Sequence, residues 1–550
     1  MRNIEPIRVK SAAEIDWDKS VDVLVAGFGG AGAAASIEAR EQGCSVLAVD
    51  RFDGGGATAF SGGIYYAGNT RFQREAGYSD SVEDMYNYLA LEVGDVVSPK
   101  MLRDFCEKSE ANIEWLAGHG VQFDSSAYEG KTIYPPEDKF LYYAGNEKVP
   151  AYADRAKPVP RGHRTKGEGF TGKDFYAALK RAALSLGVEL KPHTQVTRLV
   201  MDQNDAVIGA ELKCLERPQD IKRHAALYKR IHPMQPFIMD KAQKAIEEAE
   251  ALEDRGARKL MVHVKSGVVL STGAFSYNLD MLRNHLPLVA RNVHALMRLG
   301  SMGCDGSGIQ LGLSAGGSIG RMENVFLGRA IAPPDELVRG LMVNVRGERF
   351  VNEDIYTGLL GNAILRQPEG KAWLVIDNET FYRTLKQCLP NGDGAFKAYK
   401  LPALLNFMFG GTRKARSLTE LADKCGFDRE ELERTVSGYN RACAEGGTDP
   451  GGKNPDYMRP LGKGPYRAVN SSIGNKYSFP IFFTLGGLNV DEGRGLVLDE
   501  VGQPIKGLYA AGRAAVGICS ENYFSGMSLA DCVYTGRRAA IDAASSGCVK

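Results

Sequence analysis

The stretch that most constrains the fold of this chain is VDVLVAGFGGAGAAASIEAREQGCSVLAVDR, residues 21–51. It begins with an apolar run typical of a buried parallel strand and breaks at Gly27-x-Gly29-x-x-Gly32. It then continues as an alanine-rich helix and returns as a second strand that ends at Asp50. Such glycines permit a tight turn and let backbone N–H groups approach a pyrophosphate, and the acid can accept hydrogen bonds from a ribose. The sequence therefore predicts a βαβ unit that binds a dinucleotide.

Other segments extend this pattern along the chain. A second glycine-rich loop, GGGATAFSGGIYYAG, occupies residues 54–68, while KSGVVLSTGAF (265–275) and PIKGLYAAGR (504–513) each contain a short apolar strand that ends in a small-residue turn. A nicotinamide domain does not need the second loop, but a flavin that is threaded deeper into the protein does. A cofactor domain assembled from distant segments therefore favours FAD.

Composition sets the broader limits. A chain of 550 residues is too long for one ordinary core, so we expect two or more domains. The net charge of +1 gives no footprint for a nucleic acid, and the ten cysteines have no metal-ligand spacing, which predicts no metal site and free thiols in a reducing cytosol. The first twenty residues lack an apolar signal region, and no run of about eighteen apolar residues occurs. We expect a cytoplasmic protein.

Six motifs are spread over most of the chain: GGATAFSGG, VVLSTGAF, MGCDGSGIQLGLSAGG, RGERFVNED, TLGGLNVD and GLYAAGR. Together they resemble the FAD-dependent fumarate reductase/succinate dehydrogenase-like flavoprotein superfamily. The resemblance implies an α/β fold with an α+β cap. A Rossmann-like FAD-binding domain would be assembled from residues 1–277 and 465–550, and a catalytic cap domain of residues 278–464 would cover the isoalloxazine.

The fingerprint and the resemblance together predict the cofactor contacts. Because GATAFSGG contains no histidine, we expect non-covalent FAD. The helix that begins near Gly526 would point its positive N-terminal end at the flavin pyrimidine ring. Most family members carry a glutamate after AAG, whereas this chain has Arg513. The expected FAD-binding residues are Gly27, Gly29, Gly30, Ala31, Gly32, Asp50, Arg51, Ala57, Thr58, Ser61, Gly62, Gly63, Val196, Thr272, Gly273, Asp305, Gly512, Arg513, Ser528 and Leu529.

Residues 521–526, ENYFSG, indicate the substrate class. In fumarate reductases an arginine in the matching segment clamps a dicarboxylate, but this chain has Tyr523 there. A second family arginine, beyond the RFxNE motif, is also missing, and the region contains Tyr356 and Thr357. Since guanidinium groups are the side chains that recognise carboxylates well, a small dianionic substrate is not expected. Two tyrosines and a serine suit a neutral ketone in an apolar pocket.

This set of side chains resembles the 3-ketosteroid dehydrogenases of the superfamily, and among them those that form the Δ4 double bond. The resemblance implies that Tyr523 donates to the C3 carbonyl, that Ser525 takes the C4 proton and that Tyr356 relays it, while flavin N5 accepts a hydride. Sister enzymes that form the Δ1 bond have a glycine four residues after the tyrosine, and here that position is Met527. Δ1 chemistry and a flavin-dependent enone or fumarate-type reductase remain the alternatives.

An alternative hypothesis from a different functional class is that the chain is a flavin-binding electron-transfer or redox-sensing subunit without a substrate site. The polar trio of Tyr523, Ser525 and Tyr356 argues against it. For the enzyme, the expected partners are a hydrophobic ketosteroid and an electron acceptor, for which a quinone is one candidate.

About 45 residues lie between the strand-like segments VIGAELK (207–213) and KLMVHV (259–264), where the family usually has a short hairpin. The second half of this insertion, 214–258, predicts a charged helix with a solvated face. The first half is basic and carries Ile221, Ala225, Tyr228 and Ile231 at helical spacing. It fits either a helix packed on the body or a peripheral membrane anchor at the inner face of the membrane, which would insert Ile221, Tyr228, Ile231 and Phe237 between headgroups.

Overall fold

The computed structural model describes residues 4–231, 239–329, 331–389, 400–446, 448–478 and 480–547. At its centre lies a nine-stranded sheet with the order β1-β9-β10-β11-β2-β3-β8, to which β22 and β21 attach beside β11. The pairs β11–β2, β2–β3, β3–β8 and β11–β22 are parallel. The strands are β1 (Ile7–Arg8), β2 (Lys19–Ala26), β3 (Val46–Val49), β8 (Glu189–Lys191), β9 (Thr194–Met201), β10 (Val207–Leu215), β11 (Ala257–Leu270), β21 (Leu496–Leu498) and β22 (Pro504–Ala510).

The predicted βαβ unit forms β2, α1 (Gly30–Glu41) and β3. Gly27 has φ +94°, a backbone conformation that glycine adopts without strain, and a Cβ on Gly32 would lie 1.9 Å from the carbonyl oxygen of Gly27. These two glycines therefore let helix α1 start directly against the end of β2. The predicted α/β class, with the cofactor domain assembled from distant segments, is confirmed.

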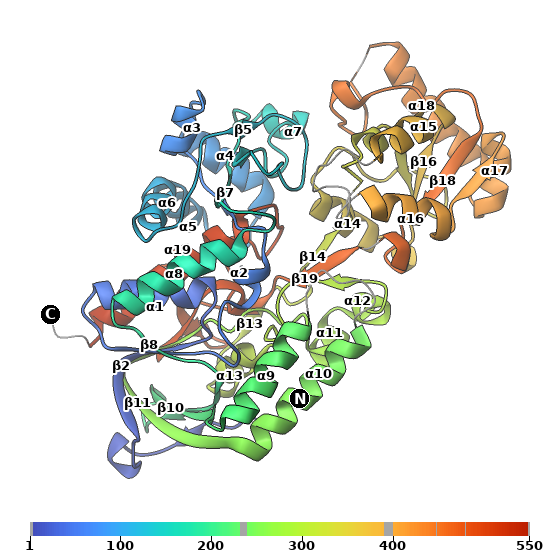
Figure 1. Cartoon of the computed structure of the whole chain (residues 1–550). Helices are drawn as coiled ribbons and strands as arrows, with labels where there is room; N and C mark the ends of the chain where they lie inside the picture. Colours follow the sequence, from blue (N-terminus) through green and yellow to red (C-terminus); the bar gives the residue numbers. More distant parts are fainter. Residues whose placement is uncertain are drawn as a thin grey trace.

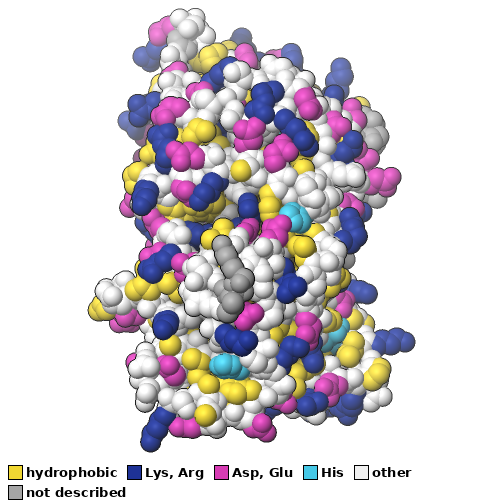
Figure 2. Space-filling model, turned by 90° about the vertical axis from the view of Figure 1, so that its left-hand side faces the viewer, with side chains coloured by type: hydrophobic (Ala, Val, Ile, Leu, Met, Phe, Trp, Pro, Cys, Tyr) yellow, Lys and Arg dark blue, Asp and Glu magenta, His cyan; other side chains and the backbone are white. Residues whose placement is uncertain are grey.

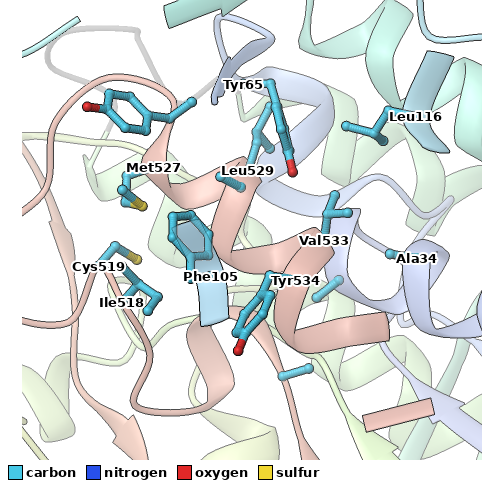
Figure 3. Close-up of a cluster of buried hydrophobic side chains, with 14 of the residues drawn as sticks. Ala34, Tyr65, Phe105, Leu116, Ile518, Cys519, Met527, Leu529, Val533 and Tyr534 are labelled. Carbon is cyan, nitrogen blue, oxygen red and sulfur yellow. The ribbon is translucent and has the colours of Figure 1, made fainter. Parts of the chain in front are cut away.

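Three helices cover one face of this sheet: α1, α8 (Gly172–Ser185) and α19 (Met527–Ser545) (Figure 1). Helix α19 comes from the far end of the chain and packs against α1, so the last segment completes the core of the first. Figure 3 shows Leu529 and Val533 of α19 among buried side chains from several other segments, including Phe105 and Leu116. The start of α19 is thereby fixed in position.

A helical subdomain follows the second glycine-rich loop and stands above α8 in Figure 1. It encloses a four-stranded sheet of order β4-β7-β6-β5. The glycine-rich loop itself contains the short helix α2 (Gly56–Phe60). The elements of the subdomain are β4 (Ile64–Tyr66), α3 (Arg71–Glu75), α4 (Val82–Val93), α5 (Pro99–Glu107), α6 (Ser109–Gly118), β5 (Ala127–Tyr128), β6 (Leu141–Tyr142), α7 (Pro150–Ala153) and β7 (Gly162–Arg164).

A separate lobe, upper right in Figure 1, is built on the four-stranded sheet β15-β16-β18-β17. It consists of β15 (Leu341–Val343), α14 (Thr357–Leu365), β16 (Trp373–Ile376), α15 (Asn378–Gln387), α16 (Leu401–Phe409), β17 (Arg413–Ala415), α17 (Leu418–Cys425), α18 (Arg429–Ala444) and β18 (Tyr466–Asn470). This lobe overlaps the proposed cap of residues 278–464, and β18 lies just beyond that boundary. The domain limits stay a proposal.

Between the main sheet and this lobe lies a three-stranded sheet of order β12-β19-β14. The connecting elements are α11 (Leu279–His285), α12 (Pro287–Asn292), β12 (Met297–Arg298), α13 (Ser307–Ser314), β13 (Ile319–Gly320), β14 (Val325–Gly328), β19 (Ile481–Thr484) and β20 (Gly487–Leu488). Their apolar side chains share one core with the main sheet.

The insertion folds as two helices, α9 (Pro218–Arg230) and α10 (Met239–Gly256), which lie side by side in Figure 1. Tyr228 and Ile231 are buried in a cluster with side chains of the FAD-binding domain. The membrane-anchor interpretation is therefore wrong for these two residues, because both lie inside the protein. Phe237 lies outside the described residues. The alternative prediction, a helix packed on the body, is confirmed for α9.

Charged side chains of both signs intermingle over the face shown in Figure 2. Within the described ranges, no helix combines the length and apolar character needed to cross a bilayer. In those ranges no cluster of three or more His, Cys, Asp or Glu side chains could hold a metal ion. Eight of the described cysteines are free, but Cys44 is disulfide-bonded, so the expectation of free thiols throughout is wrong at this position.

Candidate flavin and substrate site

A long cavity runs along the carboxyl ends of the parallel strands, where ligands bind in open α/β sheets. It is lined by Gly27 after β2, Asp50 after β3, Ser271 after β11 and Arg513 after β22. Segments that are far apart in sequence therefore meet at one edge of the sheet. This is the arrangement that the three separate strand-and-turn motifs predict.

The middle of the cavity is formed by backbone. Gly29 is the N-cap of α1, and no side chain caps this helix, so its positive N-terminal end faces the cavity. The Gly30 N–H donates to Thr58 Oγ1 at 3.0 Å, which holds the second glycine-rich loop against the first. A Cβ on Gly29 would make only ordinary van der Waals contact, with the Gly55 carbonyl oxygen at 3.5 Å. Such a cradle fits the pyrophosphate of FAD.

At one end of the cavity, Asp50 holds the loop in shape. Its two carboxylate oxygens accept hydrogen bonds from the N–H groups of Phe28 and Phe52, both at 2.8 Å. Burial raises the pKa of Asp50, and these backbone donors oppose the rise. Because a carboxylate has about four acceptor positions, Asp50 can still accept from a ribose. That role remains a prediction.

The structure places most of the predicted cofactor residues on the cavity wall. Those that line it are Gly27, Gly29, Gly30, Ala31, Asp50, Arg51, Ala57, Thr58, Ser61, Gly62, Val196, Thr272, Gly273, Arg513, Ser528 and Leu529. The predicted residues that do not line it are Gly32, Gly63, Asp305 and Gly512. Gly32 contacts the backbone of Gly27, and Asp305 pairs with Arg51 at 2.7 Å. The direct contacts predicted for these four residues stay predictions.

The insertion contributes to the same end of the cavity. Tyr228 of α9 lines it and stacks on Phe52 with 4.6 Å between ring centroids. Arg51 binds Glu253 of α10 through Nε at 2.7 Å and Nη2 at 2.9 Å. Burial is the largest single influence on the pKa of Glu253 and raises it. The charge of Arg51 and the hydrogen bonds from His224 and Arg51 together outweigh burial and lower this pKa to about 2. The sequence did not predict this role, because helical spacing alone does not show what the helix packs against.

Elsewhere on the wall of the same cavity, Tyr523 packs against a pair of stacked phenylalanines. Its ring meets those of Phe326 at 4.9 Å and Phe483 at 4.8 Å, both edge-to-face, and these two phenylalanines stack on each other. Burial raises the pKa of Tyr523 to about 12, while the charge of Arg513 opposes the rise. The phenol is therefore neutral at pH 7 and available as a hydrogen-bond donor in apolar surroundings.

Ser525 is held in the cavity by two hydrogen bonds. Its N–H donates to the Ala144 carbonyl at 3.1 Å, and its Oγ accepts from the Tyr142 hydroxyl at 2.6 Å. Tyr142 lies on β6 and is fully buried. Sequence analysis missed this tyrosine, because 383 residues separate it from Ser525 and no motif surrounds it.

Tyr356 completes the predicted trio on the cavity wall, and it also lines a second, adjoining cavity. Its N–H donates to Asn146 Oδ1 at 2.6 Å. The amide of Asn146 in turn donates to Glu92 Oε1, also at 2.6 Å, and Tyr88 donates to the same oxygen at 2.9 Å. Burial raises the pKa of Glu92 to about 7. A buried acid thus fixes the backbone that carries Tyr356.

Two glycine-rich loops form a dinucleotide cradle that opens into an aromatic pocket. This combination defines the chain as a flavoprotein. It belongs to the FAD binding domain family, whose model matches residues 22–529, and the FAD prediction is thereby confirmed. The chain is an FAD-dependent oxidoreductase. The predicted membership in the fumarate reductase-like superfamily is confirmed as well by the relatives it matches.

Over 523 residues the chain is 37% identical to 3-oxo-5-alpha-steroid 4-dehydrogenase of Comamonas testosteroni, covering 92% of this chain and 95% of that protein. The crystal structure of 3-ketosteroid-Δ4-(5α)-dehydrogenase from Rhodococcus jostii RHA1, in complex with 4-androstene-3,17-dione, is similar with a TM-score of 0.80 and 30% identity, covering 98% of this chain and 100% of that one. NADH:fumarate oxidoreductase of Klebsiella pneumoniae (strain 342) is 27% identical over 96% of this chain but only 48% of its own length.

Proposed function

We propose that this chain is an FAD-dependent 3-ketosteroid dehydrogenase that introduces a C4–C5 double bond. The observation that carries the proposal is that the partly buried Tyr523 and the buried Ser525 line one cavity, where the Tyr523 ring packs against Phe326 and Phe483. The names of the two Δ4-dehydrogenases described above support it. They also favour substrates of the 5α series.

In this proposal the Tyr523 hydroxyl donates to the C3 carbonyl oxygen. Negative charge that develops on that oxygen is stabilised by the donor, which acidifies the adjacent C4–H. Phe326 and Phe483 exclude water from the rings of the substrate and hold the phenol in place. FAD, when bound, supplies the acceptor for the hydride that leaves C5.

Ser525 is the proposed acceptor of the C4 proton. Because Tyr142 donates to its Oγ, the hydroxyl proton of Ser525 is left to point elsewhere, and Tyr356 is the proposed receiver. As Ser525 takes the proton from C4, its own proton moves to Tyr356, whose phenolic proton moves on to solvent. The second cavity, which Tyr356 also lines, offers the path for this transfer. Serine alone is a weak base, so this coupling is required.

The test is anaerobic mixing with a panel of saturated 5α- and 5β-3-ketosteroids, followed by flavin absorbance and product identification. We expect bleaching of the flavin and a 4-ene-3-ketone product. A 1-ene product would contradict the proposed bond, and the lack of bleaching with every steroid would contradict the substrate class.

Tyr523→Phe removes one donor to the developing oxyanion and should lower turnover by about 10²–10³. Ser525→Ala should be at least as damaging, and Tyr142→Phe should lower turnover with little change in KM. Deuterium exchange at C4 reports the proton step separately from hydride transfer. Normal exchange in Ser525→Ala would transfer the role of base to another group.

The electron acceptor and the place of the protein in the cell are further parts of the proposal. We retain a quinone as the candidate acceptor and a cytoplasmic location. Because Tyr228 and Ile231 are buried, α9 has no apolar anchor at these positions. It still exposes four basic residues, Lys222, Arg223, Lys229 and Arg230. We propose that these side chains make a peripheral contact with anionic headgroups. Salt-sensitive co-sedimentation with anionic vesicles, lost on charge removal, is the expected result.

A further inference from the structure

Arg513 carries its positive charge into the flavin cavity without a partner. It follows β22, and its guanidinium lies 3.9 Å from the centroid of the Phe483 ring. In the part of the chain that the structure describes, no hydrogen bond or ion pair reaches this guanidinium, and its Nη1 is buried without an acceptor. An unpaired cation in apolar surroundings is costly. The arrangement is therefore one that an anion in the cavity would complete.

The position of Arg513 narrows the choice of anion. On one side, a Cβ on the neighbouring Gly512 would lie 2.9 Å from Cβ of Ala31, at the start of α1. On the other side, Phe483 beneath the guanidinium meets the ring of Tyr523. Arg513 thus lies between the pyrophosphate cradle and the aromatic pocket, where the flavin ring must lie if the substrate is held by Tyr523.

The protein's own acids do not neutralise Arg513. The carboxyl group with which it interacts over a longer range is that of Asp531 on α19, whose Oδ1 accepts from the Ile518 N–H at 3.2 Å. Burial raises the pKa of Asp531 to about 6, with Arg513 among the smaller opposing influences. Asp531 is thus directed at the backbone rather than at the guanidinium.

We infer that Arg513 is the electrostatic partner of the anionic reduced form of the bound FAD, and that it raises the reduction potential of the flavin. Transfer of a hydride to FAD adds two electrons and one proton and leaves one negative charge on the pyrimidine side of the ring. Arg513 and the uncapped N-terminus of α19, whose N-cap is Gly526, both line the cavity and would place positive charge toward that side of the bound FAD. The chain thereby favours removal of hydride from a substrate over its addition.

The test measures the midpoint potential of the bound FAD in wild type, Arg513→Gln and Arg513→Lys by equilibration with a reference dye. We expect Arg513→Gln to lower the potential by at least about 30 mV, a tenfold change in equilibrium for a two-electron couple. Arg513→Lys should keep most of the wild-type value. The pH above which the reduced FAD is anionic, read from its absorbance, should rise in Arg513→Gln. Arg321→Gln is the matched control, because Arg321 is paired with Asp95 and Glu521 outside the cavity.

A purely structural or pyrophosphate-binding role gives a different result. In that case Arg513→Gln would weaken FAD binding while the potential of the FAD that remains bound stayed unchanged, which would overturn the inference. If Arg513→Gln does not hold FAD, Arg513→His provides the comparison within one protein, since its charge can be removed by raising the pH. If the inference holds, the midpoint potential of Arg513→His falls relative to the wild type as the histidine loses its charge between pH 5 and 8. The same pH dependence of the midpoint potential in Arg513→His and in the wild type would overturn the inference. Both measurements are made without a steroid, so they are independent of the proposed substrate.

Discussion

Gly29 and Gly32 belong to one fingerprint but serve different purposes, and substitutions should separate them. Gly29 lines the cavity and a Cβ there would make only ordinary contact, 3.5 Å from the Gly55 carbonyl oxygen, whereas a Cβ at Gly32 would lie 1.9 Å from the Gly27 carbonyl oxygen. Gly29→Val should therefore fold and lose FAD, because the branched side chain occupies the approach to the pyrophosphate. Gly32→Val should fail to reach the folded state. Absorbance of bound flavin and circular dichroism of both variants check this prediction.

An outcome in which Gly29→Val retains stoichiometric FAD would show that the cofactor does not approach this glycine. Gly118→Ala provides the control, since a Cβ there meets nothing within 4 Å and the position is remote from the cavity.

Glu92 should make the stability of the protein depend on pH. Its pKa in the folded state is raised to about 7 by burial, from an ordinary value of 4.5. Between these values the folded state holds a proton that the unfolded state has lost, so stability falls as the pH rises and levels off above about 7. The slope is at most about 1.4 kcal/mol per pH unit. Glu92→Gln should remove this loss, because glutamine keeps the acceptor for Tyr88 and Asn146 without ionising.

The measurement is the Tm of wild type and Glu92→Gln at pH 5, 6, 7 and 8. We expect the difference to shift in favour of Glu92→Gln as the pH rises. Glu83→Gln on the same helix is the control, because Glu83 is exposed and Arg103 lowers its pKa. Parallel curves for wild type and Glu92→Gln would contradict a buried, titrating Glu92.

How far single residues could be predicted depended on whether a motif surrounded them. Tyr523, Ser525 and Tyr356 lie in recognisable segments, and all three reach the cavity wall. Tyr142 lies on a two-residue strand, and only the folded sheet brings it to Ser525. The contact between Tyr142 and Ser525 was therefore unpredictable, because the two residues are far apart in the sequence and no motif links them.

The helices α9 and α10 form a clamp over one end of the cofactor cavity, and removing them should weaken FAD binding. Leu215 pairs directly with Ala257 across β10 and β11, so a short turn can replace residues 217–256 without disturbing the strands. The shortened protein should fold and bind FAD less tightly, because Tyr228 and the Arg51–Glu253 ion pair are lost. Tyr228→Ala alone should raise the Kd for FAD about tenfold, or ~1.4 kcal/mol.

Fluorescence titration of apoprotein with FAD gives these dissociation constants. Lys222→Ala, on the exposed face of the same helix, is the matched control and should bind FAD as the wild type does. Unchanged affinity in both Tyr228→Ala and the shortened protein would rule out the clamp.

Strands and helices were predictable where the periodicity was strong. The predicted strand at residues 21–26 and the second strand, SVLAVD, correspond to β2 and β3, and both halves of the insertion are helical. The face of α9 was ambiguous, because a basic helix with an apolar stripe has the same pattern on a membrane as against a protein core. Burial of Tyr228 and Ile231 decides between the two.

The whole molecule is held together around its cofactor site. Side chains from Ala26 to Cys532 line the cavity, and they come from the main sheet, the helical subdomain, the insertion and the segments that lead to the cap lobe. The sequence predicted this non-contiguous assembly from the repeated strand-and-turn motifs. It could not predict how the lobes sit on each other, because no local pattern encodes contacts between surfaces so far apart in the chain.

Because one ligand contacts so many segments, FAD binding should stabilise the entire fold. A ligand that binds only the native state adds RT ln(1 + [L]/Kd), which is about 2.7 kcal/mol at a free concentration of 100 Kd. The apoprotein should therefore have a lower Tm than the holoprotein, and added FAD should raise it continuously with the logarithm of its concentration. Gly29→Val should melt at the temperature of the apoprotein and show no response to FAD. Differential scanning calorimetry of holoprotein, apoprotein and Gly29→Val tests this linkage, and a Tm of the wild type that does not change with FAD would mean that the cavity walls are held by protein contacts alone.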